Sequence, residues 1–140
     1  MMDEIYFDMI NTLNNLRHIN LLLDGVVDFC TFETKGIKIK PAPVNLEEAI
    51  MYICDLYHIT CEAKSIKHTI EIDKNLTADG GVIWNTDIKK FSVVFAMIYH
   101  NAIKFCDSGE ITIKLLCDET VPNLICVKII DTGIGIENGQ

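Results

Sequence analysis

The fold is decided between residues 87 and 136, in the two motifs His100-Asn101-Ala102-Ile103-Lys104-Phe105 and Asp131-Thr132-Gly133-Ile134-Gly135-Ile136. The first motif closes an apolar pattern of helical period that begins at Asp87, a natural helix cap. Two strand-like runs, 110–116 and 124–130, follow it, and the second leads directly into the glycine motif. The chain therefore places an asparagine on a helix and an Asp-x-Gly-x-Gly loop at the end of a later strand.

The residues upstream predict the rest of a layered domain. Asn45 and Glu48 have the spacing of a capping box, and the apolar pattern after them predicts a helix to about Lys64. Residues 37–40 and 68–73 alternate like strands. The order helix, strand, helix, strand, strand predicts an α+β fold, a two-layer α/β sandwich, rather than a βαβ repeat.

Residues 3–34 predict one long helix that ends before Gly36. Its apolar residues form a heptad seam with a second stripe beside it, and a face this wide suits a bundle of several helices. We favour self-association through the seam over the alternative, a helix that lies on its own domain. The seam is Tyr6, Met9, Leu13, Leu16, Asn20, Leu23, Val27 and Cys30, and the second stripe is Ile19, Leu22, Val26 and Phe29.

Charge and hydropathy limit the class of protein. The formal net charge of −8 disfavours a nucleic-acid surface, which needs clustered positive charge. No apolar run approaches the roughly 18–20 residues that span a bilayer, and the acidic start of the chain is unlike a secretory signal. We therefore expect a cytoplasmic chain without a membrane segment, although a full-length relative can be attached to a membrane.

The six cysteines show no CxxC spacing. Cys54, His58 and Cys61 fall on one face of a predicted helix, which suggests two interpretations. Three soft ligands can hold zinc, but a structural site needs a fourth. A buried stripe of a core helix is the interpretation that we favour.

The two motifs carry chemistry only when they are taken together. A carboxylate at Asp131 can accept a hydrogen bond from an exocyclic amine such as that of adenine, and Gly133 and Gly135 allow a close approach or positive φ. Asn101 and Lys104 share a helix face and suit Mg²⁺ and phosphate, respectively. Separately, the loop is ordinary turn chemistry and the helix face is an ordinary solvated one.

The order and spacing of the motifs resemble the ATP-binding Bergerat (GHKL) fold, and most closely the sensor histidine kinases of the hybrid type. Residues 100–105 look like the N-box of that family and residues 131–136 like its G1 box. Leu21–Phe29 is similar to the end of the second helix of the dimerisation domain. The resemblance implies a dimerisation helix over 1–36 and the N-terminal part of an ATP-binding domain over 37–140.

The resemblance also implies roles and partners. Asn101 would help to hold Mg²⁺ and the phosphates, Lys104 would lie near the phosphates, and Asp131 would read the adenine amine beside Gly133 and Gly135. The module would belong to a two-component phosphorelay, in which the ATP γ-phosphoryl passes to a histidine. Its partners would be a second copy or a full-length kinase, through the N-terminal helix, and the receiver domain of a response regulator.

Three departures from the family pattern leave the enzymatic activity open. No His-Glu-type acceptor box is present, and His18 lacks the neighbours of one. Met97 occupies the position of a second asparagine in the kinases, and because hydrolytic ATPases of the same superfamily have an acidic base at that position, Met97 also argues against that class of enzyme. The chain ends at Gln140, before an ATP lid and a later glycine box, so we expect a fragment that is inactive alone. The alternative function is a non-catalytic dimerisation or regulatory protein.

Overall fold

The fold is seen in a computed structural model that describes residues 2–36, 38–76, 81–118, 121 and 124–135. Ile37 of the predicted strand and Ile136 of the second motif therefore lie outside the described residues. The elements, in chain order, are α1 Met2–Lys35, β1 Ala42–Asn45, α2 Leu46–Leu56, α3 His58–Ala63, β2 Ile66–Ile72, β3 Ile83–Thr86, α4 Ile88–Phe105, β4 Gly109–Cys117 and β5 Ile125–Asp131.

The strands form two sheets. In the larger sheet, of order β2-β4-β5, β2 is parallel to β4, and β5 is antiparallel to β4 with Asp131 opposite Ile111. The crossover from β2 to β4 contains β3 and α4, so the fold includes one parallel βαβ connection. In the smaller sheet, β1 is antiparallel to β3.

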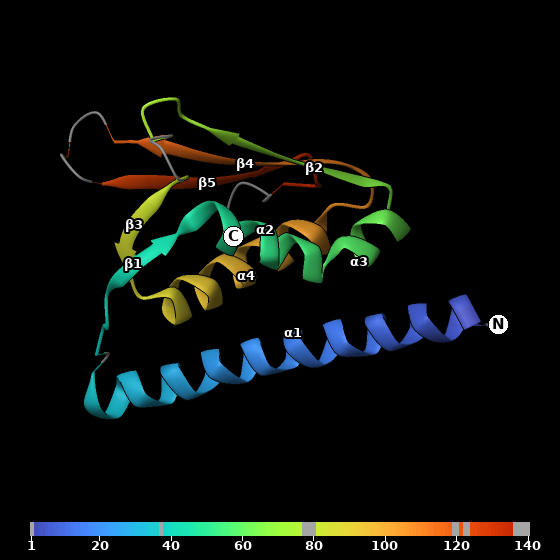
Figure 1. The fold of residues 1–140 in the computed structure, drawn as a ribbon, viewed down its shortest axis with the longest axis horizontal. Coiled ribbons are helices and arrows are strands. Elements are labelled where there is room, and N and C mark those ends of the chain that lie inside the picture. The colour runs from blue at the N-terminus through green and yellow to red at the C-terminus, as the bar shows by residue number, and fades with distance from the viewer. Residues whose placement is uncertain (1, 37, 77–80, 119–120, 122–123, 136–140) are drawn as a thin grey trace.

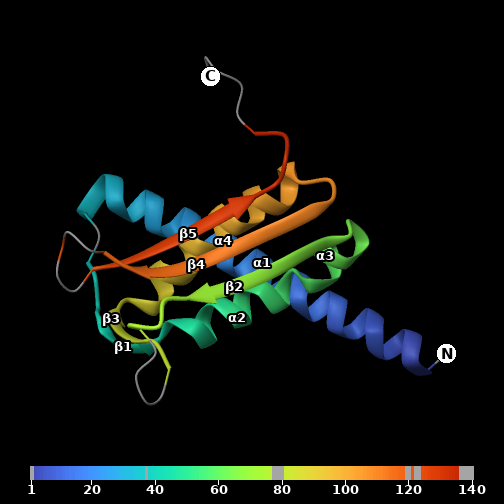
Figure 2. The same ribbon diagram turned by 90° about the horizontal axis from the view of Figure 1, so that it is seen from above.

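The helices lie in layers on one side of the larger sheet. α2, α3 and α4 cover its inner face, and α1 lies on the far side of these helices (Figures 1 and 2). Alternate residues of β4 point into the core, where Ile111, Ile113 and Leu115 are fully buried against Tyr99 and Ile50. The predicted two-layer α/β sandwich preceded by a long helix is confirmed.

Local hydrogen bonds explain where the helices begin and end. The Asn45 side chain accepts the Glu48 N–H, so the predicted cap is present, but the Glu48 carboxylate accepts from the Asn45 side-chain amide at 2.9 Å and not from its backbone N–H as in a capping box. The Asp87 carboxylate caps α4 as predicted. At the other end of α4, the Lys64 ammonium donates to the carbonyls of Ile103 and Cys106 at 2.8 and 3.1 Å.

Two predictions in the middle of the chain are wrong. Residues 38–40 are not a strand; the strand lies later, over β1, where it pairs with β3. The single helix predicted from Asn45 to Lys64 is broken at Tyr57, which ends α2 and starts α3. The Tyr57 side chain is buried in the core, and this tertiary packing overrides the local helical pattern.

The zinc alternative does not hold for this segment. Cys54 and Cys61 are buried, as the favoured interpretation requires, but His58 is exposed and pairs with Glu62 at 3.3 Å. Burial raises the pKa of the Cys54 thiol to about 12, and a protonated thiol is a poor ligand. Within the described ranges, no group of three or more metal-ligating side chains occurs.

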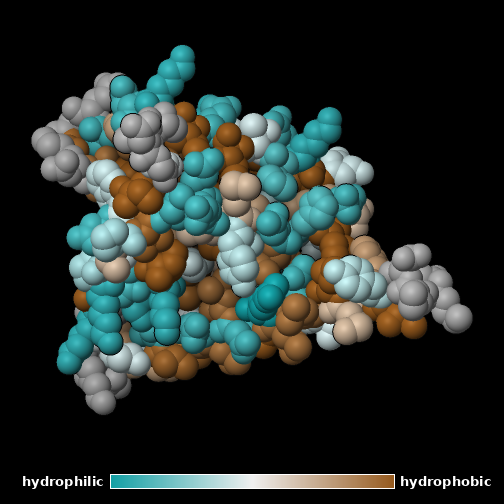
Figure 3. Space-filling view, in the orientation of Figure 1, coloured by the Kyte–Doolittle hydropathy of each residue, from teal (hydrophilic) through white to brown (hydrophobic). Residues whose placement is uncertain are grey.

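α1 uses an unexpected face to contact the rest of the chain. Its partly buried positions are Asn11, Asn14, His18, Leu21, Gly25 and Asp28, which follow heptad spacing on a different stripe from the predicted seam. The apolar residues of the seam stay exposed, among them Leu16 (54%) and Leu23 (55%), and Figure 3 shows apolar residues along the α1 edge. The helix thus lies on its own domain and still leaves the seam free. No helix among the described residues is long and apolar enough to cross a membrane.

Candidate functional site

The two motifs meet at a cavity of about 280 Å³ between α4 and the end of β5, which we call the α4–β5 cavity. Asn101 contributes from the helix, and Asp131 and Gly135 contribute from the strand end and the loop. Its remaining walls are the apolar residues Ile98, Ala102, Phe105 and Ile129. Two positions thirty residues apart in the sequence therefore share one small, mostly apolar hollow.

Asn101 reaches the cavity because of the rotation of α4. Ala102 and Ile103 are buried, which turns the neighbouring Asn101 to the outer side of the helix. Lys104 shares the outer side but is not a described wall of the cavity; its ammonium lies 5.1 Å from the centroid of the Phe105 ring. Lys104 is therefore beside the cavity, at the phenyl ring that forms part of its wall.

Asp131 is the last residue of β5, and its carboxylate is already partly engaged. Its Oδ1 accepts the N–H of Gly133 at 2.9 Å, which closes a local turn. The side chain is exposed, and the preceding Ile130 is 46% exposed, so the end of β5 is open to solvent. The second carboxylate oxygen has no hydrogen bond among the described residues and remains available to a ligand.

Gly133 and Gly135 are required for two different reasons. A Cβ at position 133 would lie 2.4 Å from the carbonyl oxygen of Phe105, so only glycine fits against the end of α4. Gly135 has φ +69°, a left-handed conformation that glycine adopts readily. The N–H of Ile134 donates to the same Phe105 carbonyl at 3.2 Å, which fastens the loop to the helix.

Thr132 is a positioning residue that the sequence reasoning did not identify. Its Oγ1 accepts the N–H of Glu110 at 3.0 Å, and its own N–H donates to the Glu110 carbonyl at 3.2 Å. These bonds tie the glycine loop to the start of β4. A hydroxyl between the aspartate and the glycine was the available signal, because threonine readily bonds to neighbouring backbone.

The other residues singled out from the sequence lie elsewhere. His100 and His18 face each other across the α1–α4 contact with ring centroids 5.3 Å apart, and the His18 ring also contacts Tyr57. Burial, and secondarily the neighbouring His100, lower the pKa of His18. The Met97 sulfur lies toward α1 at Gly25, and Met97 is not a described wall of the α4–β5 cavity.

Comparison with known proteins gives sequence relatives of one kind, although no family model matches the chain. The autoinducer 2 sensor kinase/phosphatase LuxQ of Vibrio cholerae is 27% identical over 121 residues, which cover 86% of this chain and 14% of LuxQ. The sensor histidine kinase RcsC of Salmonella typhimurium is 26% identical over 129 residues, 91% of this chain and 13% of RcsC. The chain thus spans about one seventh of the length of these relatives.

Solved structures of histidine kinases share the fold as well. The Acinetobacter baumannii histidine kinase AdeS has a TM-score of 0.68 at 15% identity, with 89% of this chain and 58% of AdeS covered. Full-length ShkA in complex with AMPPNP has a TM-score of 0.70 at 19% identity, over 87% of this chain and 25% of ShkA. The histidine kinase ThkA in complex with the response regulator protein TrrA has a TM-score of 0.58 at 17% identity, over 84% and 32%.

The sequence relatives are sensor histidine kinases, and the fold is that of histidine-kinase structures. The chain is similar in sequence to sensor histidine kinases, and its globular part has the fold seen in histidine-kinase catalytic domains.

Proposed function

We propose that this chain is a histidine-kinase-like ATP-binding module that takes the nucleotide into the α4–β5 cavity. The observation that carries the proposal is that Asn101 and Asp131 line the same cavity. A volume of about 280 Å³ lies just below the roughly 300–1,000 Å³ of small-molecule sites. The cavity thus suits the base, with the phosphates directed toward the open side.

Residues in and beside the cavity would contact each part of the nucleotide. The apolar side chains of Ile98, Phe105 and Ile129 would provide nonpolar contacts for a purine ring. The free oxygen of Asp131 would accept a hydrogen bond from the exocyclic amine of adenine, and a base without that donor would leave the oxygen unpaired. Asn101 and Lys104 lie on the outer side of α4, where an amide oxygen and a point charge would face the phosphates.

The donor set also fits a magnesium ion that arrives with the nucleotide. Mg²⁺ is commonly held by one or two protein oxygens together with phosphates and water. The Asn101 amide oxygen supplies one such donor, and the described residues offer no larger ligand cluster to bind the ion independently. When bound, the ion would neutralise phosphate charge.

Phosphoryl transfer, and the partners of the module, belong to the same proposal. The γ-phosphoryl would pass to a histidine of a dimerisation domain, and a receiver domain would then accept it; ThkA is known in complex with such a regulator. We do not assign the acceptor role to His18, because its Nε2 is buried against the domain. We propose residues 1–36 as the dimerisation helix, with the exposed seam as the contact to a second copy or to a full-length kinase, and residues 37–140 as the nucleotide-binding part.

Isothermal titration with AMPPNP and Mg²⁺ tests the nucleotide proposal. We expect the parent chain to bind, and we expect both Asp131→Asn and Asn101→Ala to weaken binding by about tenfold or more. Asp107→Asn is the matched control, because Asp107 is exposed and does not line the cavity. Absence of binding in the parent, or equal losses for Asp131→Asn and the control, would contradict the assignment.

A further inference from the structure

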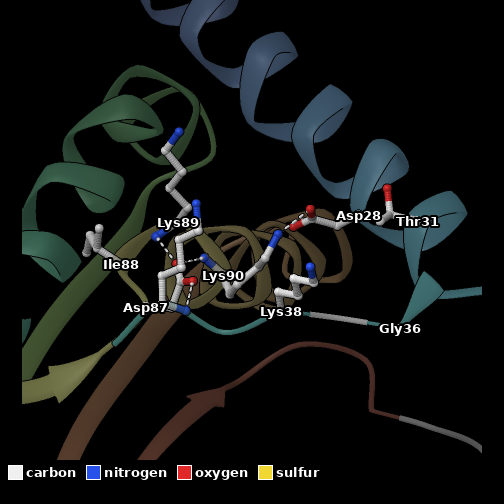
Figure 4. Close-up of a pocket in the computed structure, with 9 residues that line it drawn as sticks. Asp28, Thr31, Gly36, Lys38, Asp87, Ile88, Lys89 and Lys90 are labelled. Carbon is white, nitrogen blue, oxygen red and sulfur yellow. Dashed lines mark hydrogen bonds and ion pairs between the residues drawn. The ribbon is translucent and has the colours of Figure 1, made fainter. Parts of the chain in front are cut away.

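A second and larger cavity, of about 640 Å³, lies where the end of α1, the linker to β1 and the start of α4 come together (Figure 4). We call it the lysine cavity. None of its walls belongs to the α4–β5 cavity. It is lined by Asp28, Thr31, Gly36, Lys38, Lys40, Asp87, Ile88, Lys89 and Lys90.

The charge of this lining opposes that of the whole chain. Four of the twelve lysines and arginines line this one cavity, against two aspartates, in a protein whose formal net charge is −8. An acidic protein that gathers a third of its cations around one hollow creates a local positive potential there. Such a potential attracts anions.

Both aspartates are occupied by the fold. Asp87 accepts the N–H groups of Lys89, Lys90 and Lys40 at 2.9–3.3 Å, and these backbone bonds, that of Lys40 foremost, lower the pKa of its carboxyl. Asp28 is paired with the ammonium of Lys90.

The ammonium groups of Lys38, Lys40 and Lys89 make no hydrogen bond or ion pair within the described part of the chain. The described residues therefore leave these three positive charges without a counter-ion.

The cations are spread around the cavity instead of gathered at one point. Figure 4 shows Lys38 and Lys90 directed into the space between the end of α1 and the start of α4, whereas Lys89 extends on the other side of Asp87. A ligand with several negative charges along its length suits cations that are spread in this way better than one compact anion does.

We propose that the lysine cavity binds a small, elongated polyanion of the polyphosphate class, and that the bound anion holds α1 against the globular part. Because Lys38 follows the end of α1 by three residues while Lys89 belongs to α4, a polyanion that pairs with both ammonium groups bridges the two sides of the junction and leaves the Asp28–Lys90 ion pair in place. A ligand that binds only the docked arrangement favours that arrangement by mass action. The anion would thereby control how firmly the helix is held to the domain.

Calorimetric titration with tripolyphosphate tests the proposal directly. The double variant Lys38→Gln/Lys89→Gln should lose about tenfold or more in affinity, since two ammonium contacts are removed. The control Lys67→Gln/Lys128→Gln changes the net charge equally at two exposed lysines outside the cavity and should bind like the parent. Equal losses in both variants, or no binding by the parent, would overturn the site.

Two further measurements separate the site from other sources of binding. Inorganic phosphate should bind much more weakly than tripolyphosphate, and Lys104→Gln, at the residue proposed to lie near the nucleotide phosphates, should leave tripolyphosphate binding unchanged; equal affinities, or loss in Lys104→Gln, would refute an elongated ligand in the lysine cavity. Hydrogen exchange at the end of α1, residues 28–36, should slow when tripolyphosphate is bound. Unchanged exchange with saturated binding would refute the role in holding the helix.

Discussion

Gly133→Ala is the sharpest test of how the glycine loop is held. The added Cβ would lie 2.4 Å from the Phe105 carbonyl oxygen and 2.8 Å from Asp131 Oδ1, distances at which something must move. Neither neighbour can yield easily, because the carbonyl belongs to the last turn of α4 and the carboxylate closes the local turn. The loop must therefore move away from the helix and give up the hydrogen bond from Ile134 to Phe105.

The size of the effect follows from these contacts. Forced overpacking costs about 1–3 kcal/mol. The lost backbone hydrogen bond, worth about 1 kcal/mol, is one way in which this cost is incurred, so the total stays at about 1–3 kcal/mol. If the closed loop is needed to complete the nucleotide cavity, a cost of about 1–3 kcal/mol corresponds to roughly a 5- to 150-fold loss in AMPPNP affinity. Urea unfolding should show a lower free energy of unfolding by a comparable amount.

Gly36→Ala is the matched control. Gly36 also has positive φ, +73°, but a Cβ there meets nothing within 4 Å, so only backbone strain is added, at the far end of α1. Its AMPPNP affinity should equal that of the parent. The reasoning would be refuted if Gly133→Ala matched the parent in both affinity and unfolding free energy.

Three further predictions concern the rest of the chain. The pKa of His18 is lowered by burial and by His100, so the folded state binds fewer protons than the unfolded one. The stabilisation that neutral His18 contributes is therefore fully present above about pH 6.5, and the free energy of unfolding falls as the pH drops below it. Urea unfolding at successive pH values should show a smaller fall in His18→Gln. Asn45→Ala removes the cap of α2 and should lower the free energy of unfolding by about 1 kcal/mol, measured by the same titration, whereas an unchanged midpoint would mean that the cap contributes nothing. Leu16→Glu with Leu23→Glu places charge on the exposed seam and should reduce the mass measured by sedimentation from that of a dimer to that of a monomer. The helical circular dichroism should not change. An unchanged mass would contradict the assignment of the seam as the dimer contact.

Local patterns in the sequence were sufficient to predict the features that depend only on neighbouring residues. The caps at Asn45 and Asp87 and the turn glycine at 36 were predicted correctly, because capping and left-handed backbone are governed by a few adjacent residues. The helical period of residues 88–105 was also sufficient to predict α4. The order of the motifs was specific enough to indicate the fold that the relatives share.

Tertiary packing decided the features that local patterns did not indicate. The buried side chain of Tyr57 breaks what the sequence presents as one continuous helix. α1 contacts its domain through the stripe that includes His18 and Gly25, because Gly25 lets the helix approach Val93 closely and Asp28 finds Lys90 there. The apolar seam, the stronger pattern in the sequence, is left on the surface.

The candidate site shows the same division. The sequence by itself determined which chemical groups are present: an amide at 101, a carboxylate at 131 and glycines at 133 and 135. Only the tertiary structure decided that Asn101, Asp131 and Gly135 share a cavity, that Lys104 lies beside it, and that four lysines from the linker and α4 surround another. The physical reason is that side-chain chemistry is carried by each residue, whereas proximity is set by the packing of α4 on the sheet and of α1 on α4.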